Sequence, residues 1–205
     1  MKKFIAILAA FLILPVILLA QDNSKQIAAF AESYAKEAAG NYADAAKALK
    51  AVYAETSYEI NLRLGWLTYL QGQFTESLAY YNRAIELMPY AIEPRLGVAY
   101  PASAQGNWDF VVLQYKEILK IDPNQTLTLY RMGLILYERK EYQQAAEHFA
   151  KVVNLYPFDH DSLLMLAWTS FQLGKTREAK VLFQKVLLYN PNDKSAQEGL
   201  SLIAK

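Results

Sequence analysis

Apolar residues recur along most of the chain at the three- and four-residue spacing of an amphipathic helix. Within residues 58–71, Leu62, Trp66 and Tyr69 follow this spacing and predict a first helix. Residues 75–88 predict a second helix of the same kind. Its inward apolar positions are Leu78, Tyr81, Ile85 and Leu87. The pattern therefore predicts a pair of helices that meet along their apolar faces.

Glycine and proline mark the ends of such helices at a constant period. The prolines lie at Pro89, Pro123, Pro157 and Pro191. The glycines lie at Gly72, Gly106 and Gly174, with Lys140 in the corresponding place of one further unit. Glycine permits the left-handed conformation that ends a helix, and proline cannot continue one because it has no N–H to donate. A single helix pair cannot bury its apolar face alone, so the repeated pattern predicts pairs stacked into a continuous core.

The period divides the chain into segments. Four units are predicted at 58–91, 92–125, 126–159 and 160–193. Residues 21–57 contain a looser helix pair whose turn is Gly40-Asn41-Tyr42, and we interpret this segment as a degenerate N-terminal repeat. Residues 194–205 predict a final capping helix. The expected fold class is therefore all-α, a solenoid of about five antiparallel helix pairs with a C-terminal cap.

The repeated residues resemble the tetratricopeptide repeat (TPR) family over most of the chain. Leu64-Gly65 and Met132-Gly133 match the Leu-Gly step of that family's repeat pattern, and Gly72-Gln73-Phe74 matches its turn. The resemblance implies a right-handed superhelix in which the first helix of each unit lines a concave surface that binds peptides or protein segments.

The second unit departs from the pattern. Leu96-Gly97 comes earlier than the period requires, and Pro101 lies within the expected first helix, although Gly106 is back in register. We therefore expect a small insertion to be absorbed near Pro101 by a shortened or kinked helix. This is either local accommodation of an insertion or a bend that shapes a binding surface.

The N-terminal segment has the pattern of a secretory signal peptide. Lys2 and Lys3 precede an unbroken apolar run from Phe4 to Ala20, and the polar segment 21–25 follows. Residues 1–20 are expected to be removed. Because the apolar run also reaches the lower limit of about 17 residues for a membrane-spanning helix, an uncleaved anchor is the alternative. The expected location is periplasmic or secreted, or membrane-anchored facing outside the cytoplasm. A membrane is a partner only if the segment is retained.

Composition excludes several classes of function. The chain has no Cys and two His, which excludes disulfides, thiolate metal sites and a cage of several histidines. The 21 basic and 20 acidic residues offer no excess positive charge for a nucleic acid. We expect His148 to lie exposed on a second helix and Asp161 to cap a helix beside His160, without an acid–base constellation. The sequence therefore predicts no enzyme, no metal and no cofactor.

The predicted concave groove carries aromatic rings and two guanidinium groups. Its candidate binding residues are Arg63, Trp66, Tyr69, Tyr100, Tyr130, Arg131, Tyr137, Trp168 and Phe171. Aromatic residues and arginine supply much of the energy of protein interfaces, but the same stripe also fits packing inside a tight superhelix. The Lys and Asn residues of the family's carboxylate clamp are absent from the matching positions, so C-terminal chaperone tails are not implied.

We therefore expect a non-catalytic protein-interaction scaffold outside the cytoplasm that binds a peptide or protein segment of an unidentified partner. Two alternatives remain open. One is a membrane-tethered envelope assembly factor. The other is a glycan-binding envelope module, since tyrosine and tryptophan also stack on sugar rings.

Overall fold

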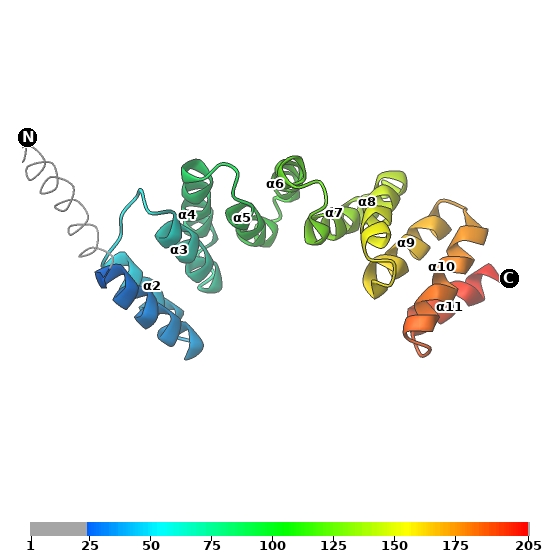
Figure 1. The fold of residues 1–205 in the computed structure, drawn as a ribbon, viewed down its shortest axis with the longest axis horizontal. Helices are drawn as coiled ribbons and strands as arrows, with labels where there is room; N and C mark the ends of the chain where they lie inside the picture. Colours follow the sequence, from blue (N-terminus) through cyan, green and yellow to red (C-terminus); the bar gives the residue numbers. More distant parts are fainter. Residues whose placement is uncertain (1–23, 205) are drawn as a thin grey trace, which may run out of the picture. The chain divides into compact units, whose positions relative to one another are not determined.

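The computed structural model describes residues 24–204, which form helices joined by short turns and contain no strand (Figure 1). The all-helical prediction is confirmed. The predicted signal segment, residues 1–20, lies outside the described residues. Among the helices of the described part, none combines the length and the apolar character needed to span a membrane.

The helices divide between two compact units, one ending at Trp108 and the other beginning at Asp109. The N-terminal unit contains a helix over 24–38, followed by α2 (Tyr42–Lys50), α3 (Tyr58–Leu70), α4 (Phe74–Leu87) and α5 (Glu93–Ala104). The C-terminal unit contains α6 (Trp108–Ile121), which begins at the boundary, α7 (Thr126–Glu138), α8 (Tyr142–Leu155), α9 (His160–Gln172), α10 (Thr176–Tyr189) and α11 (Lys194–Ile203).

The turns within the helix pairs have the predicted backbone. Gly72, Gly106 and Gly174 have φ of 74°, 74° and 72°, and Lys140 adopts the same left-handed region with φ of 61°. The left-handed conformation is strained for Lys140 and not for glycine, because the lysine Cβ approaches the backbone.

Side-chain caps begin several of the other helices. Asp159 caps α9 by accepting a hydrogen bond of 2.9 Å from the N–H of Ser162. The expectation that Asp161 caps this helix was wrong, because α9 begins at His160 and Asp161 already lies in its first turn. An acidic cap satisfies one of the free N–H groups at the start of the helix.

The core is organised by aromatic rings that pack directly against glycines of neighbouring helices. The ring of Tyr81, on α4, is 3% exposed and lies against both Gly65 of α3 and Gly97 of α5. A Cβ added at Gly65 would lie 2.8 Å from Cγ of Tyr81, and one added at Gly97 would overlap the ring. Glycine therefore sets the distance at which the ring and the two helices meet.

The same arrangement recurs in the C-terminal unit. Phe149 of α8 lies against Gly133 of α7, and Phe183 of α10 lies against Gly199 of α11. Both rings are fully buried. In α4, α8 and α10, an aromatic ring of the second helix is thus packed directly against a glycine of a neighbouring helix.

The expectation of an insertion in the second unit was wrong. Helix α5 ends at Ala104 and α6 begins at Trp108, in full register with the end of α3 at Leu70 and the start of α4 at Phe74. No extra residues therefore need to be absorbed. Gly97 is not a displaced Leu-Gly step, because its partner is the ring of Tyr81 in the preceding helix pair.

Helix α5 continues through Pro101 to its end at Ala104. It has 12 residues, whereas α3 has 13, so the expected shortening amounts to a single position. That position is missing from the start of α5, before Pro101 is reached. The helix also carries Pro94 in its first turn, where the lack of an N–H costs nothing.

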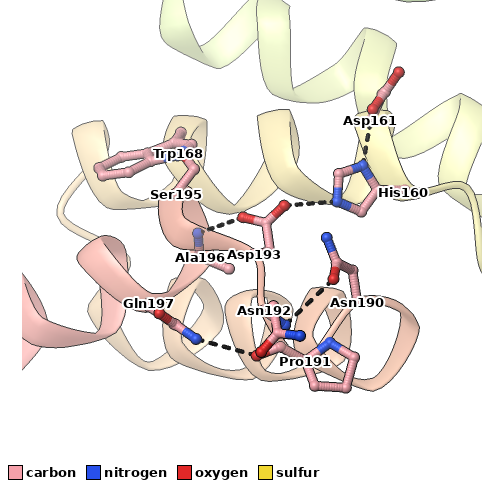
Figure 2. A network of polar contacts seen from close by, with 10 residues as sticks. All are labelled: His160, Asp161, Trp168, Asn190, Pro191, Asn192, Asp193, Ser195, Ala196 and Gln197. Carbon is pink, nitrogen blue, oxygen red and sulfur yellow. Dashed lines mark hydrogen bonds and ion pairs between the residues drawn. The ribbon is translucent and has the colours of Figure 1, made fainter.

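A histidine connects α9 to the C-terminal helix α11 (Figure 2). Nε2 of His160 lies 2.9 Å from Oδ2 of Asp193, and Nδ1 lies 2.8 Å from Oδ1 of Asp161. Asp193 also caps α11 by accepting from the N–H of Ala196 at 2.8 Å. Two ring nitrogens that both face carboxylates are satisfied together only when both carry protons.

These contacts shift both titrating groups. Hydrogen bonding to Asp161 and then to Asp193 raises the pKa of His160, against the opposing effect of burial. Burial alone would raise the pKa of Asp193. The hydrogen bonds from the Ala196 N–H and from His160 nevertheless hold this pKa below the usual range. The protonated histidine and the ionised aspartate thus stabilise each other at the base of α11.

We expect Gly97→Ala to destabilise the N-terminal unit by about 1–3 kcal/mol, the usual cost of overpacking a core. Helix propensity alone predicts the opposite sign, since alanine favours a helix interior over glycine by roughly 0.8–1 kcal/mol. Urea unfolding followed by circular dichroism measures the difference.

Tyr81→Leu is the control background, because it removes the ring that the new methyl group would meet. In that background Gly97→Ala should be nearly neutral or stabilising. An equal loss of stability in both backgrounds would show that the ring contact is not the cause.

We also expect His160 to make the stability of the fold depend on pH. A histidine whose folded pKa is raised stabilises the fold below its unfolded pKa of about 6.5 and loses that contribution as the pH rises through the folded value. The lowered pKa of Asp193 affects the stability of the fold only at much more acidic pH. The contribution of His160 should therefore lower the urea midpoint between about pH 6 and pH 8, against the opposite contribution of His148, whose pKa is lowered. His160→Gln should show a smaller fall, and identical falls in the two proteins would count against the His160–Asp193 pair.

Candidate functional site

All nine residues of the predicted groove are half-buried, and all lie on first helices of the repeat. In the N-terminal unit these are Arg63, Trp66 and Tyr69 on α3 and Tyr100 on α5. In the C-terminal unit they are Tyr130, Arg131 and Tyr137 on α7 and Trp168 and Phe171 on α9.

The structure gathers three of the predicted rings of the N-terminal unit into one cluster. The centroid of Tyr69 lies 5.6 Å from Trp66 and 5.5 Å from Tyr100, and Trp66 meets Tyr100 edge-on at 6.0 Å. Phe74, at the start of α4, adds a fourth ring 5.9 Å from Tyr69. We call Trp66, Tyr69, Phe74 and Tyr100 the N-terminal aromatic cluster. Such tilted and edge-on contacts are the favoured geometries of aromatic pairs.

A carboxylate that the sequence analysis missed holds this cluster in place. Glu37, on the helix over 24–38, accepts a 2.7 Å hydrogen bond from Nε1 of Trp66 and forms an ion pair with Arg63. The guanidinium of Arg63 also lies over the ring of Tyr34, 3.9 Å from its centroid. Glu37 and Tyr34 lie one helical turn apart, a spacing that would have marked them as a shared face.

This arrangement changes the expected role of Arg63. Its side chain is 10% exposed, and its charge is neutralised by Glu37. A ligand carboxylate would have to displace Glu37 to reach it. The N-terminal aromatic cluster therefore offers mainly ring surface, and the arginine orients and supports it.

In the C-terminal unit the predicted rings pair with aromatics of the second helices. Tyr130 lies 5.8 Å from Phe149, and Tyr137 lies 5.3 Å from Tyr142. These edge contacts tie each groove tyrosine to helix α8 and fix its orientation.

Trp168 lies close to the buried core of this unit. It meets Phe183 edge-on at 5.0 Å and Phe171 at 5.8 Å. Its Nε1 donates a 2.8 Å hydrogen bond to Oγ of Ser195 on α11. Trp168, like Trp66, thus has its indole N–H satisfied within the protein, and only ring surface is left for a ligand.

Tyr130 and Tyr137 do not titrate near neutral pH. Burial raises the pKa of Tyr130, and the nearby Asp161 and Asp159 raise it further. Burial also raises the pKa of Tyr137. These phenols stay protonated at neutral pH and act as hydrogen-bond donors, not as bases.

His148 is half-buried, which corrects the expectation of an exposed side chain. Burial and the neighbouring Lys151 lower the pKa of His148, so its ring is neutral at pH 7. Its Nδ1 is buried and has no hydrogen-bond partner among the described residues. Within residues 24–204, no group of three or more His, Asp or Glu side chains is placed to hold a metal ion.

Comparison with known proteins points to one family. Residues 30–92 and 136–205 match two family models that are both described as tetratricopeptide repeat. The type IV pilus assembly protein PilF of Pseudomonas aeruginosa is 28% identical over 149 residues, which cover 71% of this chain and 58% of that protein. The chain thus spans little more than half of that relative.

Solved structures of similar fold carry the same family name or belong to MamA proteins. A tetratricopeptide repeat protein of Parabacteroides merdae has a TM-score of 0.75 at 21% identity, over 88% of this chain and 72% of that one. MamA of Desulfovibrio magneticus RS-1 has a TM-score of 0.65 at 19% identity, over 71% of this chain and 82% of that one. Together with the constant period of the helix pairs, these matches support the tetratricopeptide repeat family for this chain.

Proposed function

We propose that this chain is a non-catalytic scaffold that binds a peptide or protein segment on the first helices of its repeats. Tetratricopeptide repeat domains generally bind protein partners. The observation that carries the proposal is the N-terminal aromatic cluster, whose rings are half-buried and pack against one another, with Trp66 also bonded to Glu37.

The mechanism follows from the way these rings are held. Trp66 and Trp168 bond through their N–H groups to Glu37 and Ser195, so a ligand would meet ring faces and edges. Aromatic surfaces of this kind accept apolar side chains of an extended segment. Because the rings are already ordered, binding loses little side-chain entropy.

We propose further that the chain acts outside the cytoplasm after removal of residues 1–20. The pattern of Lys2, Lys3 and the apolar run to Ala20 supports export. A role in assembling an envelope structure is the second candidate, and the name of the PilF relative, a type IV pilus assembly protein, favours it. In that case the same rings would hold a component of the assembly.

Combined substitution of Trp66, Tyr130 and Trp168 by Ala should weaken partner binding by roughly 30-fold or more, as expected when interface hot spots of about 2 kcal/mol or more are lost. Capture of partners from an extract of the native host by the chain from Gln21 onward would be compared between native and substituted proteins.

Tyr90→Ala is the matched control, because Tyr90 is an 84% exposed aromatic side chain outside the predicted groove. Circular dichroism must show equal helix content in all three proteins. Equal recovery of partners by a folded triple variant would contradict the groove.

Export gives a separate prediction. N-terminal sequencing of the protein recovered from outside the cytoplasm should begin at Gln21. A protein that keeps residues 1–20 and sediments with membranes would instead support the anchored assembly factor.

A further inference from the structure

Helix α11 covers one side of the core of the C-terminal unit. Ala196 is fully buried, and Gly199 lies against the ring of Phe183. Leu200 and Ile203 pack on the same core and are partly buried. An isolated helix shorter than about 12 residues is only marginally stable in water. Because α11 has 10 residues, it depends on this packing, and we expect its undocking and the loss of its helix to occur together.

Asp193 both begins α11 and connects it to α9. Its Oδ1 accepts the N–H of Ala196, and its Oδ2 lies 2.9 Å from Nε2 of His160. Ser195, in the first turn of α11, accepts the indole N–H of Trp168 at 2.8 Å. The helix cap, the contact with the histidine and the contact with the groove tryptophan therefore lie at the same end of α11 (Figure 2).

The preceding repeat has the same cap without the histidine. Asp159 caps α9 as Asp193 caps α11, by accepting the N–H of the residue three positions further on. The residue one repeat before His160 is Thr126, which does not ionise. A titrating contact to the cap of the next repeat is therefore specific to the junction of α9 with α11 in this unit.

The surroundings of His160 favour the ring with both nitrogens protonated. Asp161 on its own helix faces Nδ1 at 2.8 Å, and Asp193 faces Nε2. From α10, the ring of Tyr189 packs on the imidazole with 5.4 Å between centroids. The last turn of α8 and the first turn of α7, the other two helices in contact with α9, contain no charged side chain.

Loss of one proton from His160 weakens its contact with Asp193. A neutral imidazole has a single N–H, so it can donate to only one of the two carboxylates. Even the tautomer that keeps this N–H on Nε2 loses the charge-assisted bond, which is about twice as strong as a neutral one. Because Asp161 lies on the same helix as His160, its contact does not depend on the docking of α11. Asp193 is therefore the partner that couples the proton to the position of α11.

We propose that α11 is a pH-sensitive latch at the end of the predicted groove, closed while His160 carries both ring protons and opened more often once one of them is lost. Opening separates Trp168 from Ser195 and uncovers the ring of Phe183. An indole N–H and apolar surface then become accessible beside the groove. The latch itself does not rest on the proposed function, and only its effect on a bound segment does.

Amide exchange of residues 21–205, which contain all the described helices, tests the latch. NMR follows the exchange of the α11 amides with water, and correction for the intrinsic rate at each pH gives an opening constant. This constant should rise about threefold between about pH 6 and pH 8, the scale of a partly exposed charge pair. The α11 amides should also respond less to added urea than those of α10, because a local opening exposes less surface than global unfolding.

Asp193→Asn removes the charge and keeps the helix cap, since asparagine caps helices as well as aspartate does. In this variant the opening constant of α11 should be nearly the same at pH 6 and pH 8. Asp159→Asn is the matched control, because it makes the same change at the cap of α9, one repeat earlier. It should keep the rise of the native chain.

An opening constant that does not change with pH, or an equal rise in the Asp193→Asn variant, would overturn the proposal. Exchange of the α11 amides only through global unfolding, with the urea response of α10, would also contradict it. None of these measurements involves a partner. A chain whose groove variant captures partners equally well can therefore keep the latch and lose the proposed function, and the reverse result is equally distinct.

Discussion

The contact between an aromatic ring of the second helices α4, α8 and α10 and a glycine of an adjoining helix is the constraint on which the packing depends. Tyr81 can lie between α3 and α5 only because Gly65 and Gly97 present no side chain to it. Close-packed interiors tolerate little change in volume at such points. The distance between the two first helices, and hence the spacing of whatever they expose, follows from this ring.

The N-terminal aromatic cluster is a consequence of that spacing. With α3 and α5 both seated against Tyr81, Trp66 and Tyr100 come within 6.0 Å of each other. Packing and ligand binding were rival explanations of the aromatic stripe, but the geometry makes them compatible. The indole of Trp66 is fixed by Glu37 on one edge and remains half-buried, so the same side chain stabilises the fold and presents a surface.

Periodic features were predictable and cross-repeat partners were not. The spacing of Pro89 and Gly72 predicted α3 and α4 to within one position at each end, because helix ends depend on local backbone chemistry. Gly97 was misinterpreted because glycine is required there by a contact with another helix, the ring of Tyr81. Glu37 was missed for the same reason, since its partners Arg63 and Trp66 belong to the following helix pair.

The nearly neutral overall charge of the chain conceals local differences in charge between its two units. In the N-terminal unit Glu37 neutralises Arg63, so that ring surface is the main feature of the N-terminal aromatic cluster. In the C-terminal unit Asp159 and Asp161 both line a pocket, and Asp161 is paired with His160. A net charge of +1 therefore does not describe the local charge in either unit. Single charges act locally in such an array, because exposed charges more than about 8 Å apart are largely screened from one another in physiological salt.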